Sequence, residues 1–237
     1  MLPKIIHYCW FGGNEKPDKA KKCIDSWRTQ CPDYEIREWN EGNVSLEACP
    51  QYVRDAYVAK KYAYASDYIR LKALNECGGF YMDTDVELLK SLDPFRGDAG
   101  VIGFENNEFV NSGQMLAAEA GHPILTEMME CYDDISFWKE DGSIYLLGCP
   151  HVNTDVLVRH GLEKNGREQT VGGFHVYPAD WFNPLDSETG ELKKTNNTVS
   201  IHWYSMSWIP AWRRARVKIM RRVRRVLRRL CRIGGRT

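Results

Sequence analysis

The first forty residues place two extended apolar segments on either side of an amphipathic helix, and this alternation constrains the fold most strongly. Residues 3–10 are rich in β-branched and aromatic side chains, which predicts a buried strand, and two glycines follow it. Residues 17–30 repeat apolar side chains at helical spacing, and residues 34–39 alternate like a half-buried strand. A strand–helix–strand start of this length predicts an α/β fold, with a mixed, largely parallel sheet flanked by helices.

Composition sets the remaining bounds on the class of protein. A hydrophobic content of 43% is too high for a disordered chain, and no apolar run is long enough to span a membrane. The N-terminal apolar stretch contains His7 and lacks a small-residue cleavage site, so we expect a first strand there and not a signal peptide. The eight cysteines form no CxxC pair, so we expect reduced, singly buried thiols and no zinc site made only of cysteines.

The formal net charge of zero conceals an uneven distribution of charge. Residues 1–212 carry 20 basic and 32 acidic side chains, whereas residues 213–237 carry 12 basic and none acidic. We therefore expect two units: a folded domain at 1–212, long enough for one full hydrophobic core, and a basic tail at 213–237. On a wheel of about 100° per residue, nine apolar side chains between residues 212 and 233 share one arc. These are Trp212, Ala215, Ile219, Met220, Val223, Val226, Leu227, Leu230 and Ile233.

This pattern predicts a basic amphipathic helix that lies on an anionic membrane surface. One alternative is a helix packed on a neighbouring subunit. Another is an arginine-rich arm that binds nucleic acid, but such an arm does not require an ordered apolar stripe. We therefore expect no nucleic-acid partner.

Two aspartates follow a short apolar segment at residues 79–82. Asp83 and Asp85 are separated by Thr84, and in an extended chain residues two apart point to the same side. Carboxylates held together at the carboxyl end of a strand repel each other unless a cation lies between them. Oxygen ligands of this kind suit Mg²⁺ or Mn²⁺. The alternative is a solvated turn with two acidic residues.

The preceding segment predicts a long helix over residues 53–77, ended by Gly78 and Gly79. Asp67 and Arg70 lie three residues apart on one face of this helix, so the two side chains can pair. The rest of that face is small and apolar, which favours a poorly solvated pair that orients a hydroxylated ligand. A surface ion pair of no consequence is the alternative.

Together these residues form the spacing A-x-x-S-D-x-x-R-x₇-G-G-x-Y-x-D-x-D over residues 63–85. This spacing resembles the DxD sugar-binding region of glycosyltransferase family 32, which includes bacterial capsule and lipopolysaccharide transferases and fungal mannosyltransferases. The segments PKIIHYCWFGG and IHWYSMSW also resemble the family's first strand and closing motif. The resemblance thus runs from residue 3 to residue 208, and the bacterial polysaccharide-synthesis branch is the most similar.

The resemblance implies a GT-A fold and a retaining, metal-dependent hexosyl transfer from a nucleoside-diphosphate sugar. On the donor side it implies that Trp10 stacks on the nucleotide base and that Tyr81 packs beside the nucleotide. It implies that Asp67 and Arg70 hold hydroxyls of the donor sugar. Trp10 as an ordinary core aromatic is the alternative.

For the metal and diphosphate, the resemblance implies that Asp83 contacts the ribose and the metal shell and that Asp85 binds Mn²⁺ or Mg²⁺ directly. It adds His202 as a metal ligand and Ser207 with Trp208 on the diphosphate. A satisfied core histidine is the alternative for His202. The tryptophans at 203, 208 and 212 could instead form an aromatic cluster that anchors the tail.

The acceptor side is expected in the middle of the chain, where Asn111 is a candidate because side-chain amides suit sugar hydroxyls, and His151 and Asp155 are further candidates. Such residues can also simply build turns. No carboxylate stands out as a nucleophile, so we expect a front-side mechanism in which the leaving phosphate helps to deprotonate the acceptor.

The overall expectation is a peripheral enzyme on the cytoplasmic face of the inner membrane. Its donor would be a UDP-sugar, with GDP-mannose as the alternative, and its acceptor a lipid-linked or lipopolysaccharide or capsule glycan. A sugar-nucleotide hydrolase on the same scaffold and a non-catalytic adaptor that uses the arginine-rich tail are the rival functions.

Overall fold

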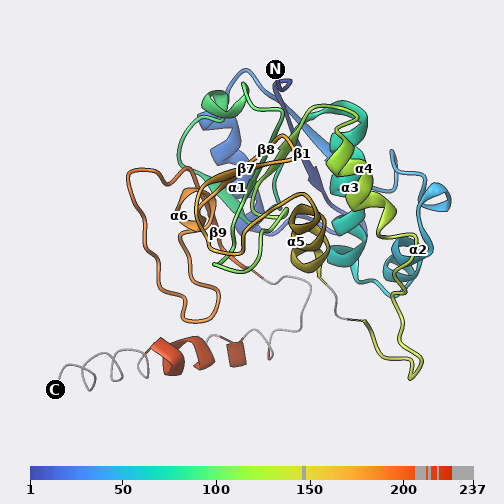
Figure 1. The fold of residues 1–237 in the computed structure, drawn as a ribbon. Coiled ribbons are helices and arrows are strands. Elements are labelled where there is room, and N and C mark those ends of the chain that lie inside the picture. The colour runs from blue at the N-terminus through green and yellow to red at the C-terminus, as the bar shows by residue number, and fades with distance from the viewer. Residues whose placement is uncertain (146–147, 206–211, 213–214, 218, 226–237) are drawn as a thin grey trace.

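A seven-stranded mixed sheet forms the centre of the computed structural model, which describes residues 1–145, 148–205, 212, 215–217 and 219–225 (Figure 1). The strand order is β2-β1-β3-β6-β5-β8-β7. Three neighbouring pairs are parallel, and three, including both pairs made by β6, are antiparallel. The strands are β1 (Ile5–Cys9), β2 (Glu35–Trp39), β3 (Gly79–Tyr81), β5 (Gly100–Gly103), β6 (Leu116–Ala118), β7 (Gln169–Val171) and β8 (Phe174–Tyr177). The predicted mixed α/β architecture is confirmed.

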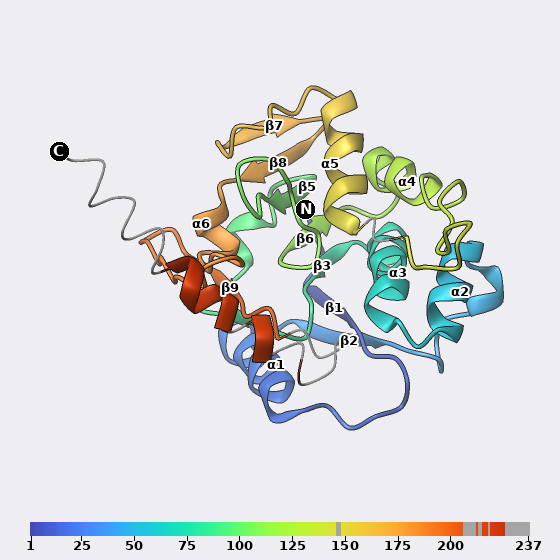
Figure 2. The ribbon, with the colours of Figure 1, turned by 90° about the horizontal axis from the view of Figure 1, so that it is seen from below.

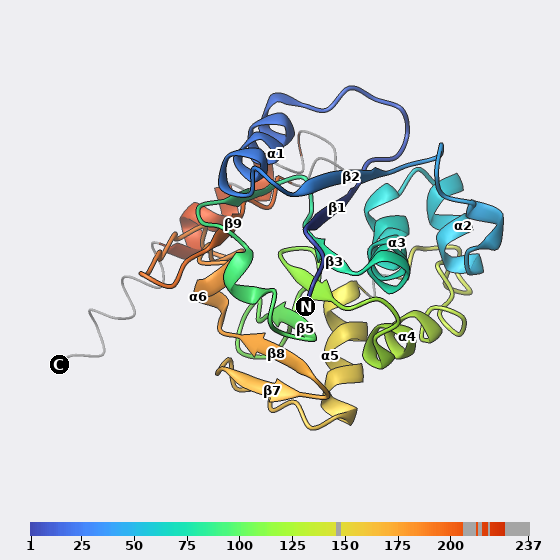
Figure 3. The same cartoon turned by 90° about the horizontal axis from the view of Figure 1, so that it is seen from above.

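Helices cover both faces of this sheet (Figures 2 and 3). One face carries α2 (Gln51–Val58), α3 (Tyr62–Cys77), α4 (Pro123–Glu130) and α5 (Cys149–Arg159). The other carries α1 (Asp18–Gln30), α6 (Ala179–Phe182) and a separate two-stranded sheet of β4 (Val86–Leu88) and β9 (Ser200–His202). The small sheet is fixed to α1 by the indole of Trp27, which donates to the Val86 carbonyl at 2.7 Å.

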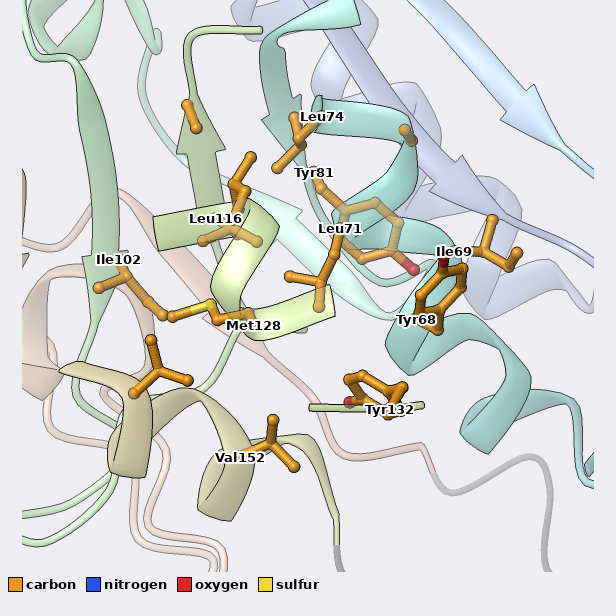
Figure 4. Close-up of a cluster of buried hydrophobic side chains, with 14 of the residues drawn as sticks. Tyr68, Ile69, Leu71, Leu74, Tyr81, Ile102, Leu116, Met128, Tyr132 and Val152 are labelled. Atoms are coloured by element: carbon orange, nitrogen blue, oxygen red, sulfur yellow. The ribbon is translucent and has the colours of Figure 1, made fainter. Parts of the chain in front are cut away.

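Side chains of the central strands alternate between two buried cores. Phe80 of β3 packs with the α1 side, whereas its neighbour Tyr81 packs with the α3 side. The same alternation holds for Val101 and Ile102 of β5. Figure 4 shows the α3-side core, in which Leu71 and Met128 pack with side chains from the strands. Because both faces are buried, these strands are almost wholly apolar.

The helix predicted over residues 53–77 is instead two helices. Lys60 adopts a left-handed conformation with φ of 57°, and the amide of Lys61 donates to the Ala56 carbonyl at 2.8 Å. This six-to-one hydrogen bond is the usual closure of a helix that ends in a left-handed residue. The break lets α3 start in a new direction, with its buried face on the sheet.

The basic tail is helical at every residue of it that the structure describes, namely 215–217 and 219–225. We call these residues the tail helix. The division of the chain at residue 212 stays a prediction. Among the described residues, no helix combines the length and the apolar character needed to cross a bilayer. The seven cysteines in the described part of the chain are free.

Candidate active site

The two aspartates of the DxD motif lie in a turn that joins the central sheet to the small sheet. The amide of Val86 donates to the Asp83 carbonyl at 3.0 Å, so residues 83–86 form a β-turn and not the extended segment that we expected. The amide of Asp83 donates to the Gly113 carbonyl at 2.8 Å, and the amide of Trp203 donates to the Asp85 carbonyl at 3.0 Å. The carboxylates therefore converge, as predicted, but neighbouring backbone fixes them instead of strand alternation.

Arg70 is the centre of the polar network beside this turn. Its Nη1 lies 3.0 Å from Asp67 Oδ1, which confirms the predicted pair, and its Nη2 lies 3.0 Å from Asp83 Oδ1. Nη1 also donates to Ser112 Oγ at 3.1 Å and to Cys149 Sγ at 3.0 Å. The Arg70 side chain is only 3% exposed. The guanidinium thus links α3, the DxD turn and the start of α5 inside the protein.

Burial and charge shift the acidities of this network. Burial raises the pKa of Asp67 to about 6, although the guanidinium of Arg70 opposes the rise. Burial alone would lower the pKa of Arg70. The nearby negative groups, above all the carboxylate of Asp83, hold that pKa well above its ordinary value. Arg70 therefore remains a cation, and its charge favours the ionised form of Asp67.

The two carboxylate oxygens of Asp83 have different surroundings. The Tyr81 hydroxyl donates to Asp83 Oδ1 at 2.9 Å, so Oδ1 accepts from both Tyr81 and Arg70. A Cβ atom at Gly113 would lie 2.3 Å from Oδ2, so only a glycine leaves room for this oxygen. Tyr81 also packs beneath the Arg70 guanidinium, whose carbon lies 5.1 Å from the ring centroid.

Asp83, Asp85 and His202 offer ligand atoms that all lie within 4.8 Å of one another. His202 Nε2 lies 3.1 Å from Asp85 Oδ1, and the Ser205 amide donates to Asp85 Oδ2 at 2.6 Å. Within the described residues, His202 Nδ1 and Ser205 Oγ are buried and have no hydrogen-bond partner. His202 thus has one ring nitrogen beside Asp85 and one without a partner among the described residues, and a carboxylate–imidazole set of this size fits a divalent cation.

The charges of the cluster also fit a cation. Burial favours the neutral forms, but His202 and the Ser205 amide together hold the Asp85 pKa below its ordinary value. Burial likewise lowers the pKa of His202, but the carboxylates of Asp85, Asp83 and Glu105 outweigh it and raise that pKa. The cluster therefore attracts positive charge. A histidine binds a metal only in its neutral form, so a bound cation would replace the proton of His202.

Residues 17–101 match the protein family described as "Glycosyltransferase sugar-binding region containing DXD motif". The matched segment includes the Asp83-Thr84-Asp85 motif. Inositol phosphoceramide mannosyltransferase 3 of Schizosaccharomyces pombe is 30% identical over 135 residues, which are 54% of this chain and 36% of that protein. Inositol phosphoceramide mannosyltransferase 1 of the same yeast is 28% identical over 130 residues, 52% of this chain and 40% of that protein. The chain therefore spans less than half the length of these curated relatives.

Among solved structures, a glycosyltransferase involved in glycosylation of the major capsid of PBCV-1 aligns with a TM-score of 0.50 at 11% identity. The alignment covers 92% of this chain and 99% of that chain. At this identity the likeness is one of fold. The predicted GT-A type of fold is confirmed.

Tyr204 and Asn183, which the sequence did not single out, add a second polar network beside His202. The Tyr204 hydroxyl donates to Glu105 Oε1 at 2.9 Å, and Asn183 donates to the same hydroxyl. The Tyr204 ring packs on His202 with centroids 4.3 Å apart, and its φ of 47° is left-handed. Ser112 and Cys149 were also missed, because their link to Arg70 crosses 42 and 79 residues and leaves no local signal.

Of the acceptor candidates, only Asn111 is tied to the DXD region. Its Nδ2 donates to Glu105 Oε2 at 3.2 Å, and its Oδ1 accepts from the Gly113 amide at 2.7 Å. His151 and Asp155 are exposed on α5, and the His151 ring packs on Phe109 with centroids 4.7 Å apart. The structure therefore does not bring His151 or Asp155 into this network.

Trp10 lies at the carboxyl end of β1, the same sheet edge as the DxD turn, because β1 and β3 are parallel and pair His7 with Tyr81. It is partly exposed, and its indole donates to the Asn14 carbonyl at 2.7 Å. It also packs against the core on the α1 side, so both the stacking role and the core role stay open. Ser207 and Trp208 lie outside the described residues.

Proposed function

We propose that the chain is a metal-dependent, retaining glycosyltransferase that takes a sugar from a nucleoside-diphosphate donor. The observation that carries the proposal is the joining of two sets of groups at one turn. Arg70, with Asp67, can bind sugar hydroxyls, and the cluster of Asp83, Asp85 and His202 can bind a divalent cation. Asp83 belongs to both sets, so the sugar and the cation would be held beside each other.

In the proposed reaction, Asp83, Asp85 and His202 would hold Mn²⁺ or Mg²⁺, which would neutralise charge on the departing diphosphate. Asp67 and Arg70 would orient the sugar so that its anomeric carbon meets the acceptor hydroxyl. Trp10 would stack on the base at the edge of the sheet, and Ser207 with Trp208 would contact the diphosphate. Tyr81 would keep Asp83 in place through the hydrogen bond to Oδ1.

A front-side mechanism remains the preferred course of the reaction. Asp67 and Asp83 each pair with Arg70, Asp85 with His202, and Glu105 accepts from Tyr204 and Asn111. Asp67, Asp83 and Asp85 already have proposed roles in holding the sugar and the cation, so among them no carboxylate is free to act as the nucleophile. Mass spectrometry of the enzyme quenched with slow donor analogues tests this, and a glycosylated carboxylate would overturn it.

The donor and acceptor classes are proposed from the family resemblance and from the names of the relatives. A UDP-sugar is the first choice, and a mannose nucleotide is the alternative supported by the names of the two yeast relatives. Those names also describe an acceptor carried on a lipid, which agrees with a lipid-linked or lipopolysaccharide or capsule glycan as the acceptor class.

Thermal-shift measurements with individual nucleotide sugars, with and without Mn²⁺, test the donor site without any acceptor. The expected result is a shift for one base and sugar that requires the cation. Asp85→Ala should lose that shift and the transfer activity while remaining folded. Asp25→Ala is the matched control, because Asp25 forms an exposed ion pair with Arg28 on α1. Undiminished transfer by Asp85→Ala would overturn the assignment, and sugar release without acceptor at the full rate would indicate the hydrolase.

A further inference from the structure

The tail helix rests on a turn of the protein body through its arginines. Arg221 Nε donates to the Ser187 carbonyl at 2.8 Å. Arg225 donates to the Thr189 carbonyl through Nε at 3.1 Å and through Nη2 at 2.9 Å. Arg221 and Arg225 are four residues apart, so they project from the same face of the helix. The helix runs beside the loop that contains these carbonyls (Figures 1 and 2).

The opposite face of the tail helix is apolar and exposed. Ile219, Met220 and Val223 are 60%, 43% and 45% exposed. At about 100° per residue, Ile219 and Val223 lie roughly 160–200° around the helix from Arg221. We call Ile219, Met220 and Val223 the outer stripe. Because the arginines hold the helix to the body, the outer stripe points away from the body.

The charge around the outer stripe identifies what covers it. Arg222 and Arg224 are exposed on the same helix, and residues 213–237 contain no acidic side chain. A second copy of the chain would bring two such basic segments together, and like charges would oppose that contact. An apolar stripe flanked by arginines is complementary to a bilayer with anionic headgroups.

The tail helix also lies next to the candidate metal cluster. The guanidinium carbon of Arg221 is 5.8 Å from the centroid of the Tyr204 ring, and that ring packs on His202. One aromatic side chain therefore separates the helix from a predicted metal ligand. A surface that covered the outer stripe would lie on the same side of the protein as the DXD region.

We propose that the outer stripe docks the protein on an anionic lipid surface, with Arg221 and Arg225 holding the body so that the DXD region lies beside that surface. This placement deepens the proposed function, on which it rests for the acceptor, because an acceptor anchored in the bilayer would meet the site directly. The lipid contact itself does not depend on any catalytic activity.

Co-sedimentation of the full chain with vesicles tests the docking. Binding is expected to vesicles of phosphatidylcholine mixed with phosphatidylglycerol, and to be much weaker with phosphatidylcholine alone. The double variant Ile219→Ser/Val223→Ser should lose at least about tenfold in affinity, because two apolar side chains no longer enter the lipid. Val158→Ser, at a 41% exposed valine of α5, is the matched control and should bind like the wild type.

Unchanged sedimentation of Ile219→Ser/Val223→Ser would overturn the lipid docking. So would a concentration-dependent dimer that this variant abolishes, or displacement of the wild type from vesicles by RNA at equal charge. The thermal shift with the nucleotide sugar should be the same in this variant and the wild type, so a failed donor site is distinguishable from a failed lipid contact.

Hydrogen–deuterium exchange on the vesicle-bound protein tests the placement. The amides of residues 186–190 should gain protection when vesicles bind, because the lipid surface would cover the tail helix and the loop beside it. Those of β7, at the far edge of the sheet, should exchange as in the free protein. Protection at β7 with none at residues 186–190 would show that another face meets the lipid.

Discussion

Replacing Asp67 by asparagine should stabilise the fold while abolishing donor binding. Asp67 is 8% exposed, and burial raises its pKa from 3.8 to about 6 even with Arg70 beside it. The difference between those values corresponds to about 3 kcal/mol of unfavourable ionisation in the folded state. An isosteric neutral side chain avoids that cost, so Asp67→Asn should gain up to about 3 kcal/mol at neutral pH.

Because folding raises the pKa of Asp67, the stability difference between Asp67→Asn and the wild type depends on pH. A carboxyl group whose pKa is raised by folding binds its proton more tightly in the folded state. Its contribution to stability is thus fully present below pH 3.8 and is lost as the pH rises through about 6. The advantage of Asp67→Asn over the wild type should therefore shrink as the pH falls from about 7 to about 4.

Urea denaturation of both proteins across this pH range measures the difference in the free energy of unfolding. Asp25→Asn, at an exposed aspartate of α1, is the control and should change stability little. Thermal shifts with Mn²⁺ and the donor report the loss of binding separately. If Asp67→Asn is less stable than the wild type at neutral pH, the charge on Asp67 stabilises the fold through Arg70 and the reasoning fails.

Three further predictions concern single positions. Gly113→Ala would place a methyl group 2.3 Å from Asp83 Oδ2, so it should lower the rate of sugar transfer at least about tenfold. The circular dichroism spectrum should stay native. Native activity would show that the turn adapts freely. Burial lowers the pKa of His7 to about 4. The free energy of unfolding of the wild type should therefore fall by up to about 3 kcal/mol as the pH drops from 6.5 towards 4. The His7→Gln variant should lack this pH-dependent loss. Lys60→Gly should leave stability unchanged or raise it by up to about 1 kcal/mol, because φ at Lys60 is 57°; a clear loss in urea denaturation would contradict this.

The parts of the fold that the sequence predicted well are those with strong local periodicity. The first strand, the first helix and the second strand were placed within one or two residues of β1, α1 and β2. Strand β6 was not predicted, because Leu-Ala-Ala has no strand preference of its own and is held by its two neighbours in the sheet. The break at Lys60 was missed because neither glycine nor proline marks it.

In the candidate site, too, contacts between residues close in the chain were predicted and contacts made by tertiary packing were not. The pair of Asp67 and Arg70 follows from helical spacing, and the convergence of Asp83 with Asp85 follows from their proximity in the chain. The contact of Arg70 with Asp83 depends on how α3 packs against β3, which no spacing encodes. The same holds for the contact of Tyr204 with Glu105, which are 99 residues apart.

The pairing of β4 with β9 has a consequence for the order of assembly. Asp85 lies 120 residues before Ser205, whose amide caps its carboxylate, and β9 supplies His202. Closing so long a loop occurs late unless other contacts have already brought its ends together. A chain emerging from the ribosome would thus carry the two aspartates without their imidazole partner while the residues between Asp85 and His202 are being added. Cation affinity would be acquired in the final step of folding, and metal binding could serve as a probe of whether that step is complete.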